Sequence, residues 1–360
     1  MGTEQIVAVF GAYGHTGRFV VTELRERGFV PLLLGRDAER LRALAASQPG
    51  LAHRVASVDD PVSLDRALEG AAAVVNCAGP FASTAAPVIE AALRAGIPYV
   101  DVAAEIEANV DTFARFAERA RSAGVAVVPA MAFFGGLGDL LVTTAMGDWT
   151  AADEAHVAYG LSSWHPTAGT LASGTVSRER RDGRRVRYTG GRLDYHDGEG
   201  ELPRLEWDFP APLGTRTVLG DFTMADVVTV PRHLAIPEVR TYMTLGAAED
   251  LAAPGTPAPV AVDGHGRSAQ TFTVDVVVRA GDTRRRVVAS GRDIYAVSAP
   301  LAVEAVRRVL DGRTRTTGVA SAGEIFDAPD FLRALSAHLS VARHDADPLP
   351  LEAGSGRLSG

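Results

Sequence analysis

The sequence predicts an α/β protein: a doubly wound parallel sheet, followed by a second α+β domain built on a mostly antiparallel sheet. Two observations support this fold class. Over the first 130 residues, short β-branched apolar runs alternate with stretches of helical period, as parallel strands joined by crossover helices do. From about residue 150, strand-like runs follow one another with turn residues between them, as in antiparallel sheets.

Six apolar runs in the first region are too short for core helices and are bounded by polar or turn residues, so we predict strands. Ligands bind beyond the carboxyl ends of the strands in such sheets, so the residues that directly follow each run are the first candidates for a site. The predicted strands are residues 7–10, 31–34, 53–58, 72–76, 99–102 and 125–129.

Capping residues mark the helices between these strands. Asp37 is placed to cap the helix after the second strand, and Pro61 fits the first position of the next. Gly96 and Gly124 are placed to end the two later helices. The predicted helices are one that begins near residue 17, then 38–46, 62–68, 85–95 and 110–123.

The second region predicts strands at residues 156–162, 184–193, 238–245, 271–279 and 284–294, the last two forming a hairpin around residues 280–283. Residues 252–259 are rich in proline and predict a loop. We therefore expect a dinucleotide-type domain at 1–130, a substrate and oligomerisation domain at 131–295, and C-terminal helices at 296–344, including 300–310 and 330–339, that pack back on the first domain. Residues 345–360 form a tail that we expect to be mobile.

Three glycines follow the first strand at i, i+3 and i+6, where a helical pattern begins. Strand, glycine turn and helix form the context of a Rossmann dinucleotide fingerprint. Gly11 allows the tight turn, Gly14 lets the backbone approach a pyrophosphate, and Gly17 lets the helix pack on the strand. The alternative is a glycine-rich turn that binds nothing. The predicted cofactor contacts in this turn are Gly11, Tyr13, Gly14, His15, Thr16 and Gly17.

Composition excludes several classes of protein. The net charge of −8 and the lack of a basic cluster argue against a nucleic-acid partner. Cys77 is the only cysteine, so we expect a reducing compartment. No apolar run has the roughly 18 residues of a membrane helix, and no signal pattern precedes the first strand, so we expect a cytoplasmic protein with no membrane partner. The nine histidines show no paired spacing with acids, so we expect no metal.

All 36 basic residues are arginines. We attribute this to the base composition of the source genome and expect a bacterial source. Without lysine, the chain forms neither a Schiff base nor a Tyr-x-x-x-Lys pair. The short-chain dehydrogenase mechanism is therefore excluded, although the glycine spacing resembles that group.

Arg36 directly follows the second strand, where the adenosine ribose of a dinucleotide lies. An arginine there accommodates a 2′-phosphate, whereas an acid binds the 2′-hydroxyl. Asp37 is the competing acid, but it is also the predicted helix cap. We therefore favour NADP(H) over NAD(H), with a solvated surface arginine as the alternative for Arg36. Asp59, after the third strand, is a further predicted cofactor contact.

The loop after the fourth strand is rich in small residues, and in this fold it passes beside the nicotinamide. We interpret Cys77 as a packed thiol, because no partner base is evident. The predicted cofactor contacts in this loop are Cys77, Ala78, Gly79 and Pro80.

Together, the glycine turn, Gly35-Arg36 and residues 75–81 and 99–101 resemble the saccharopine dehydrogenase-like reductases. This group includes saccharopine reductases, carboxynorspermidine and homospermidine synthases, and trans-acting enoyl reductases. Residues 166–173, 291–295 and 317–326 also resemble family segments, nearest to the enoyl reductase and saccharopine reductase-like branch, so that the resemblance covers about residues 5–335. The chain departs from the family at residues 133–139, where many relatives have a Phe-Asp-Ser type segment, and it is somewhat shorter.

Three residues are candidates for proton transfer. Asp101 and Glu105 flank the end of the fifth strand, and a carboxyl group beside an apolar ring has a raised pKa that suits an acid. Their alternative role is a helix cap or a hydrogen bond to a neighbouring loop. His165 suits a proton donor near neutral pH, with a plain surface histidine as its alternative.

Substrate contacts are predicted around the helix that starts at residues 167–173, whose first turn suits a carboxylate or thioester oxygen. Aromatic side chains near it are candidates for an apolar wall, and core residues are the alternative. The predicted substrate contacts are Phe133, Phe134, Trp164, Thr170 and Tyr295.

The resemblance implies an NADPH-dependent oxidoreductase that transfers hydride to a C=N or activated C=C bond of a small organic substrate. One alternative is an NAD-linked dehydrogenase in which Asp37 binds the ribose, and another is a non-catalytic NADP(H) sensor. We expect a homodimer, because the antiparallel sheet is suited to pairing across a two-fold axis.

Overall fold

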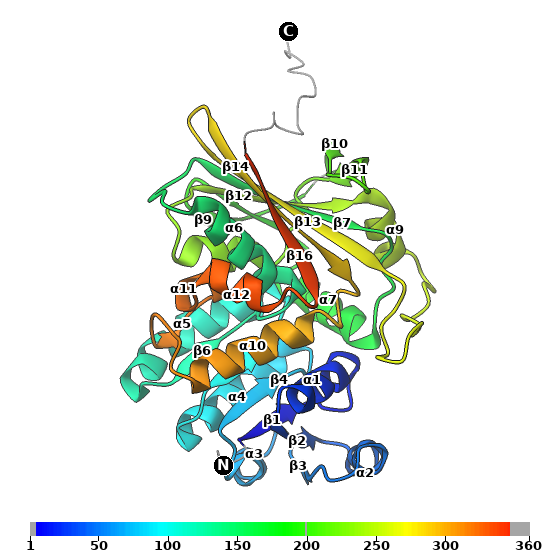
Figure 1. Ribbon diagram of the computed structural model, residues 1–360, viewed down its shortest axis with the longest axis vertical. Coiled ribbons are helices and arrows are strands. Elements are labelled where there is room, and N and C mark those ends of the chain that lie inside the picture. Colours follow the sequence, from blue (N-terminus) through cyan, green and yellow to red (C-terminus); the bar gives the residue numbers. More distant parts are fainter. Residues whose placement is uncertain (1–4, 199, 346–360) are drawn as a thin grey trace.

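Two β-sheets face each other across a layer of helices in the computed structural model, which describes residues 5–198 and 200–345 (Figure 1). The first sheet is wholly parallel and has the strand order β15-β6-β5-β4-β1-β2-β3, so the chain winds outward from β1 in both directions. Its strands are β1 (Ile6–Phe10), β2 (Val30–Gly35), β3 (His53–Val55), β4 (Ala73–Asn76), β5 (Tyr99–Asp101), β6 (Ala126–Val128) and β15 (Gly318–Val319).

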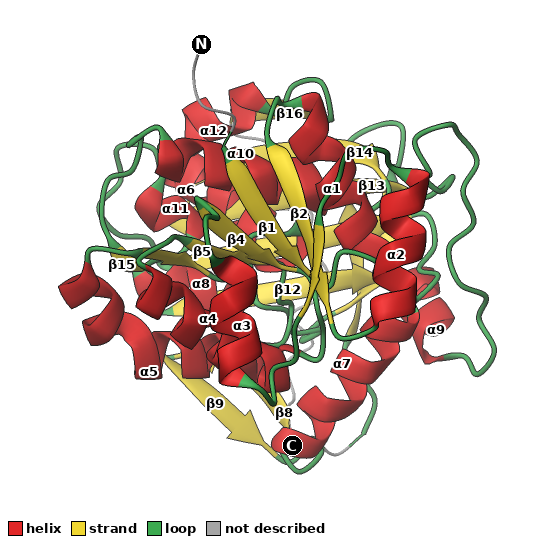
Figure 2. Cartoon of the chain, turned by 90° about the horizontal axis from the view of Figure 1, so that it is seen from below, coloured by secondary structure: helices red, strands yellow, loops and turns green. Residues whose placement is uncertain are grey.

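Helices cover both faces of this sheet because its central strands are apolar on both sides. In β1, Val7 and Val9 point to one face and Ala8 and Phe10 to the other, and all four are buried. Figure 2 shows the two groups of helices on opposite sides of the strands. One face is covered by α1 (His15–Glu26), α2 (Ala38–Ser47) and α10 (Ser298–Leu310), and the other by α3 (Pro61–Leu68), α4 (Phe81–Ala95) and α5 (Ile106–Ala123).

The second sheet has nine strands and is antiparallel except for the β12–β7 pair. Its main path runs β10-β11-β12-β7-β13-β14-β16, and β8 joins β9 to β12 at the side. Its strands are β7 (Glu154–Leu161), β8 (Arg185–Thr189), β9 (Arg192–His196), β10 (Arg204–Asp208), β11 (Thr215–Leu219), β12 (Glu238–Thr244), β13 (Thr271–Ala280), β14 (Thr283–Arg292) and β16 (Leu339–Asp345).

One continuous apolar core joins the two sheets. It runs from one face of the parallel sheet through α1 and α10 to the near face of the second sheet. In Figure 1, α10 and α6 lie between the sheets. The remaining helical elements are η1 (Phe133–Leu137), α6 (Gly138–Met146), α7 (Ala168–Arg180), α8 (Asp226–Thr229), η2 (Val230–Arg232), α9 (Leu245–Ala252), α11 (Ala322–Ile325) and α12 (Ala328–Ala334). None of the helices in the described residues is long and apolar enough to cross a membrane.

The predicted fold class is confirmed, and several predicted elements are wrong in detail. Residues 184–193 form no single strand, because Gly190 and Gly191 adopt φ of 56° and 76° and turn the chain from β8 into β9. The third strand ends at Val55, and β10, β11, α6 and α9 were not predicted. Residues 330–339 are helical only to Ala334, and Leu339 begins β16 in the second sheet. Beyond Asp345, the predicted tail lies outside the described residues.

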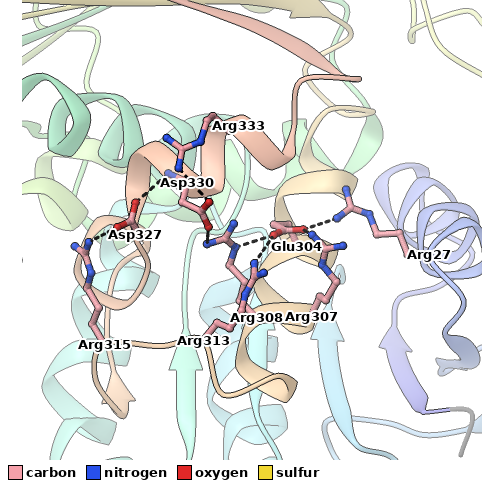
Figure 3. Close-up of polar contacts among 9 residues, drawn as sticks. All are labelled: Arg27, Glu304, Arg307, Arg308, Arg313, Arg315, Asp327, Asp330 and Arg333. Carbon is pink, nitrogen blue, oxygen red and sulfur yellow. Dashed lines mark hydrogen bonds and ion pairs between the residues drawn. The ribbon is translucent and has the colours of Figure 1, made fainter. Parts of the chain in front are cut away.

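A buried carboxylate holds the C-terminal segment to the first domain. The Glu304 side chain has no exposed area and lies among four arginines, which come from the C-cap of α1, from α10 and from the loop after α10 (Figure 3). Burial alone would raise the pKa of Glu304, but hydrogen bonds and charge from Arg307 and Arg308 outweigh it and keep the pKa below its ordinary value. The contacts of Glu304 are Arg27 Nη1 at 2.6 Å, Arg307 Nη2 at 2.5 Å, Arg308 Nε at 2.7 Å and Arg313 Nη2 at 3.4 Å.

We predict that Glu304→Gln lowers the free energy of unfolding by about 3 kcal/mol, because it leaves the buried Arg308 without its nearest counter-charge. The exposed pair of Arg333 with Asp330 gives the matched control: Arg333→Ala should cost about 0.5 kcal/mol or less. Chemical denaturation of both variants measures the difference. Equal losses of unfolding free energy in the two variants would show that the buried ion pairs of Glu304 stabilise the fold no more than an exposed pair does.

Candidate functional site

The glycine turn between β1 and α1 is packed too closely for side chains. Gly11 adopts φ of 83°, and a Cβ there would lie 2.9 Å from the Cβ of Ala78 in the loop after β4. A Cβ on Gly17 would collide with the carbonyl oxygen of Gly11. The N–H of Gly11 donates to the carbonyl of Leu34 at 2.9 Å, which ties the turn to the end of β2. The turn therefore brings backbone, rather than side chains, to the carboxyl edge of the sheet.

The first turn of α1 fits a pyrophosphate. The helix begins at His15 after an extended Gly14, which has no side chain to cap it. Its first N–H groups and the positive end of the helix dipole suit an anion at this position. Arg18 adds a positive charge, with Nε donating to the carbonyl of Tyr13 at 3.3 Å. Gly11, Gly14, His15, Thr16 and Gly17 are thus brought together as the sequence predicts, and their role as cofactor contacts stays a prediction.

After β2, the Asp37 side chain is held by hydrogen bonds, whereas the Arg36 side chain is free of them among the described residues. One carboxylate oxygen of Asp37 accepts hydrogen bonds from the N–H groups of Glu39 and Arg40, both at 3.0 Å, and so caps α2. Arg36 is exposed, and its side chain makes no hydrogen bond or ion pair within the described part of the chain. Asp59, after β3, is also exposed, and its carboxylate bonds only to Ser57 among the described side chains.

The loop after β4 is fixed by a buried amide. Asn76 Oδ1 accepts the N–H of Ala78 at 3.0 Å, and Asn76 Nδ2 donates to the hydroxyls of Thr84 and Tyr99 at 3.3 and 3.2 Å. Burial, with a smaller effect from the Asp101 charge, raises the pKa of the Cys77 thiol far above its ordinary value. Cys77 therefore lacks the thiolate character of a nucleophile.

Asp101 lies at the end of β5 and is almost fully buried. Its carboxylate accepts the hydroxyl of Tyr99 at 2.8 Å and the N–H groups of Ala103 and Ala130 at 3.0 and 2.8 Å. Burial raises the pKa of Asp101 to about 6, although these hydrogen bonds oppose the shift. The pKa of Asp101 is thus raised, as we expect from the sequence for a proton donor. Its hydrogen bonds, however, are those of the alternative role, in which Asp101 holds neighbouring loops together.

Glu105 caps another element. Its two carboxylate oxygens accept the N–H groups of Phe81 and Ala82, at 2.7 and 2.9 Å, in the first turn of α4. These contacts are those of the alternative role for Glu105 in the sequence analysis, a helix cap or a hydrogen bond to a neighbouring loop. Asp101 and Glu105 together hold the ends of β4, β5 and β6 in a fixed arrangement at the carboxyl edge of the sheet. Their role in proton transfer stays a prediction.

The hydroxyl of Tyr295 connects the second domain to the glycine turn. It accepts Trp164 Nε1 at 3.2 Å and the N–H of Thr167 at 3.3 Å, lies 2.9 Å from the Thr170 hydroxyl, and donates to the carbonyl of His165 at 3.3 Å. On the other side, the Tyr295 ring packs edge-on against His15, with centroids 5.2 Å apart. Four predicted residues from the second domain are thus gathered at the start of α7, next to the predicted cofactor turn.

Helix α7 itself lies against the loop after β4. A Cβ on Gly79 would stand 2.8 Å from the hydroxyl oxygen of Ser173, so the helix and the loop are in close contact. The second half of α7 is fastened to α5 by Ser177, whose hydroxyl lies 2.5 Å from Glu107, and by the ion pair of Arg180 with Asp111 at 2.7 Å. Helix α7, which is predicted to contact the substrate, therefore adjoins the loop that is predicted to pass beside the nicotinamide.

The aromatic residues predicted as a pocket wall are mostly core. Phe133, Phe134 and Trp164 are all buried, and Phe134 stacks on Trp164 with centroids 5.1 Å apart. Phe133 packs against Tyr159 and Phe272. Of the predicted set, Thr170 and Tyr295 are the half-buried ones. The contacts of Phe133, Phe134 and Trp164 are those of core residues. Their role in substrate binding stays a prediction.

Sequence reasoning missed a buried pair behind this wall. Asp226 on α8 has no exposed area, and its two carboxylate oxygens lie 2.9 and 2.8 Å from the hydroxyl of Tyr159. Burial raises the pKa of Asp226 to about 7. The residues around it, such as Ala225 and Val227, form no helical or strand pattern of hydrophobic residues from which burial of the aspartate could be predicted.

Within the described residues no group of three or more His, Cys, Asp or Glu side chains is arranged to hold a metal ion.

The parallel sheet and the glycine turn at its carboxyl edge define an α/β protein of the Rossmann class. Residues 7–128 match the family model described as the saccharopine dehydrogenase NADP binding domain. This match agrees with the resemblance found in the sequence and supports NADP(H) as the dinucleotide of the first domain.

Curated relatives match part of the chain. The saccharopine dehydrogenase-like oxidoreductase of Homo sapiens is 30% identical in an alignment of 154 positions, which covers 37% of this chain and 36% of the relative. A probable mitochondrial saccharopine dehydrogenase-like oxidoreductase of Arabidopsis thaliana is 32% identical in an alignment of 142 positions, which covers 35% of this chain and 31% of the relative. The chain thus matches about a third of the length of these relatives.

A solved structure extends the likeness to both domains. Apo saccharopine dehydrogenase (L-Glu forming) from Saccharomyces cerevisiae aligns with 94% of this chain and 100% of its own, with a TM-score of 0.65 and 12% sequence identity. At that identity the comparison shows the shared fold and nothing about the substrate. The chain therefore shares the fold of that structure along most of its length.

We predict that Gly17→Ala abolishes dinucleotide binding and lowers the melting temperature, because the added methyl group forces the backbone of the glycine turn apart. Gly174→Ala on α7 is the matched control, since no atom lies within 4 Å of its new Cβ. Alanine there should raise the free energy of unfolding by about 0.5–1 kcal/mol. Calorimetric titration with NADPH and thermal melting measure both effects. Normal binding by Gly17→Ala would contradict the close packing of the turn.

We predict that Asp101 titrates near pH 6 in the folded protein. Because this pKa lies above the value of about 3.9 for an unfolded aspartate, the folded state holds the proton more tightly. The contribution of Asp101 to stability therefore decreases as the pH rises from about 4 to about 6, and is constant above that range. Carbon-13 carboxyl shifts, assigned by comparison with Asp101→Asn, measure the midpoint. A midpoint below pH 4 would contradict the prediction.

Proposed function

We propose that this protein is an NADPH-dependent reductase that transfers hydride to a C=N or activated C=C bond of a small organic substrate. The observation that supports this most directly is the close-packed glycine turn, which brings bare backbone to the carboxyl edge of a parallel sheet. The family match over residues 7–128 supports the choice of cofactor. The named relatives are oxidoreductases, which supports the class of reaction.

In this proposal, residues 1–130 bind the cofactor, residues 131–295 bind the substrate and mediate self-association, and residues 296–344 pack back on the first domain. The N–H groups of the glycine turn hold the pyrophosphate, Arg36 holds the 2′-phosphate, and the loop from Cys77 to Pro80 lies beside the nicotinamide. When bound, the nicotinamide supplies the hydride. The first turn of α7, with Thr170 and Tyr295, orients the substrate, and Phe133, Phe134 and Trp164 support that turn from the core.

Among the three proposed proton donors, the contacts favour His165. Asp101 and Glu105 are buried, and their carboxylates accept hydrogen bonds from backbone N–H groups. His165 is half-buried, and its ring has no hydrogen-bond partner within the described residues. It lies next to Trp164 at the start of α7, where the carbonyl of His165 accepts the Tyr295 hydroxyl. We therefore propose His165 as the donor, and Asp101 and Glu105 as positioning residues.

Two alternatives remain distinct from this proposal. In an NAD-linked dehydrogenase Asp37 would bind the ribose, but its carboxylate already caps α2. A non-catalytic NADP(H) sensor would bind the cofactor and reduce nothing.

Within the proposed reductase activity, we favour the enoyl reductase and saccharopine reductase-like branch. We also propose that the protein is a cytoplasmic homodimer of bacterial origin, with no nucleic-acid or membrane partner.

We predict that the protein oxidises NADPH when supplied with members of a panel of imines and conjugated enoyl compounds. His165→Gln should lower kcat by about a hundredfold, the usual effect of losing a general acid, with NADPH affinity within twofold of wild type. His265→Gln, in an exposed loop, is the matched control and should leave kcat unchanged. Absorbance at 340 nm follows the reaction. NADPH binding without turnover on the whole panel would favour the sensor.

A further inference from the structure

Two arginines near the carboxyl end of β2 have unpaired charges. Arg36 directly follows the strand, and Arg40 lies in the first turn of α2. Both side chains are exposed, and neither makes a hydrogen bond or an ion pair within residues 5–198 and 200–345. This distinguishes them from arginines such as Arg27 and Arg308, whose charges are taken up by Glu304.

Tyr13 holds Arg40 toward the end of β2. The Tyr13 ring lies over Gly35, where a Cβ would come 2.5 Å from the ring. The hydroxyl of Tyr13 accepts the N–H of Asp37 at 3.4 Å, and the guanidinium of Arg40 lies 4.4 Å from the centroid of the same ring. A cation over an aromatic face is attracted to it, so the ring restrains a side chain that would otherwise move freely in solvent. Tyr13 thus connects the glycine turn, the end of β2 and Arg40.

The nearby acids form no ion pair with Arg36 or Arg40 among the described residues. The carboxylate of Asp37 is turned to the N–H groups of Glu39 and Arg40, where it caps α2. Asp60 caps α3 in the same way, and Asp59 bonds to Ser57. Glu39 is exposed and makes no ion pair with either arginine among the described residues. An anion at the end of β2 would therefore meet two guanidinium groups and a phenol.

We propose that Arg40, stacked on Tyr13, is a second specificity residue for the cofactor's 2′-phosphate and binds it together with Arg36. This inference rests on the proposed function, in which the cofactor is NADPH. The ribose of a dinucleotide lies at the end of β2 in this fold, and a phosphate dianion offers three oxygens to the planar donors of two arginines. The ring of Tyr13 orients Arg40, and its hydroxyl keeps the backbone after Arg36 in place.

Calorimetric titration of the full chain with NADPH, NADH and adenosine 2′,5′-bisphosphate tests the proposal. Arg40→Ala and Arg36→Ala should each weaken NADPH and the bisphosphate about tenfold, and should change NADH less than twofold. Tyr13→Ala should reproduce part of the Arg40→Ala loss, whereas Tyr13→Phe keeps the ring and should lose less. Arg42→Ala is the matched control, because Arg42 is on the same helix but its Nε donates to the carbonyl of Ala38. It should leave all three affinities within twofold.

Each outcome supports or overturns the inference. Equal losses of NADH and NADPH in Arg40→Ala would show that Arg40 stacks on adenine, and unchanged NADPH affinity would show that it contributes nothing; either result overturns the proposal while leaving the NADPH-dependent function intact. A wild-type protein that binds neither NADPH nor the bisphosphate would overturn both. Thermal melting confirms that each variant is folded before its affinity is compared.

Discussion

The two sheets share one apolar core, and this constraint fixes how the candidate residues of the two sheets lie relative to one another. The chain returns after the second sheet as α10, which is buried between α1 and η1 and fastened through Glu304 to Arg27. The same C-terminal segment adds β15 to the parallel sheet and β16 to the other sheet. Since a packed core resists deformation, the start of α7 and the glycine turn are held in a fixed relation. Tyr295 joins them through its contact with His15, and Ser173 of α7 lies against Gly79 in the loop after β4.

At the carboxyl edge of the parallel sheet, carboxylates act mainly as acceptors for backbone N–H groups. Asp37 and Glu105 cap helices, and Asp101 joins the loops after β5 and β6. A carboxylate that accepts several hydrogen bonds from main-chain donors is suited to holding loops and poorly suited to exchanging a proton with a substrate. For the proposed chemistry we therefore favour groups with free polar atoms, such as His165, which lies two residues before Thr167, the N-cap of α7.

The sequence allowed the parallel half of the fold to be predicted because its signals are local. Glycine spacing, capping residues such as Asp37 and C-terminal glycines such as Gly96 depend on a few neighbouring residues, and the structure has them where expected. The second sheet was predicted less well, since β11 pairs with β12 and β16 pairs with β14, partners that lie far from them in the sequence. The Tyr159–Asp226 pair has the same cause, because two residues 67 positions apart become buried only when both elements pack.

The absence of lysine makes the positions of unpaired arginines informative. A chain with a net charge of −8 repels a dinucleotide at long range, but salt screens that repulsion over about 8 Å, so charges in contact with the ligand decide binding. Where an arginine serves the fold, as Arg308 does, a carboxylate lies within hydrogen-bond distance. At the end of β2 the nearest carboxylate, Asp37, is turned to the helix N–H groups, and Arg36 and Arg40 keep their charges. The N-cap of α2 therefore starts the helix and also turns the Asp37 carboxylate to backbone N–H groups, so that both guanidinium groups remain available to the proposed 2′-phosphate.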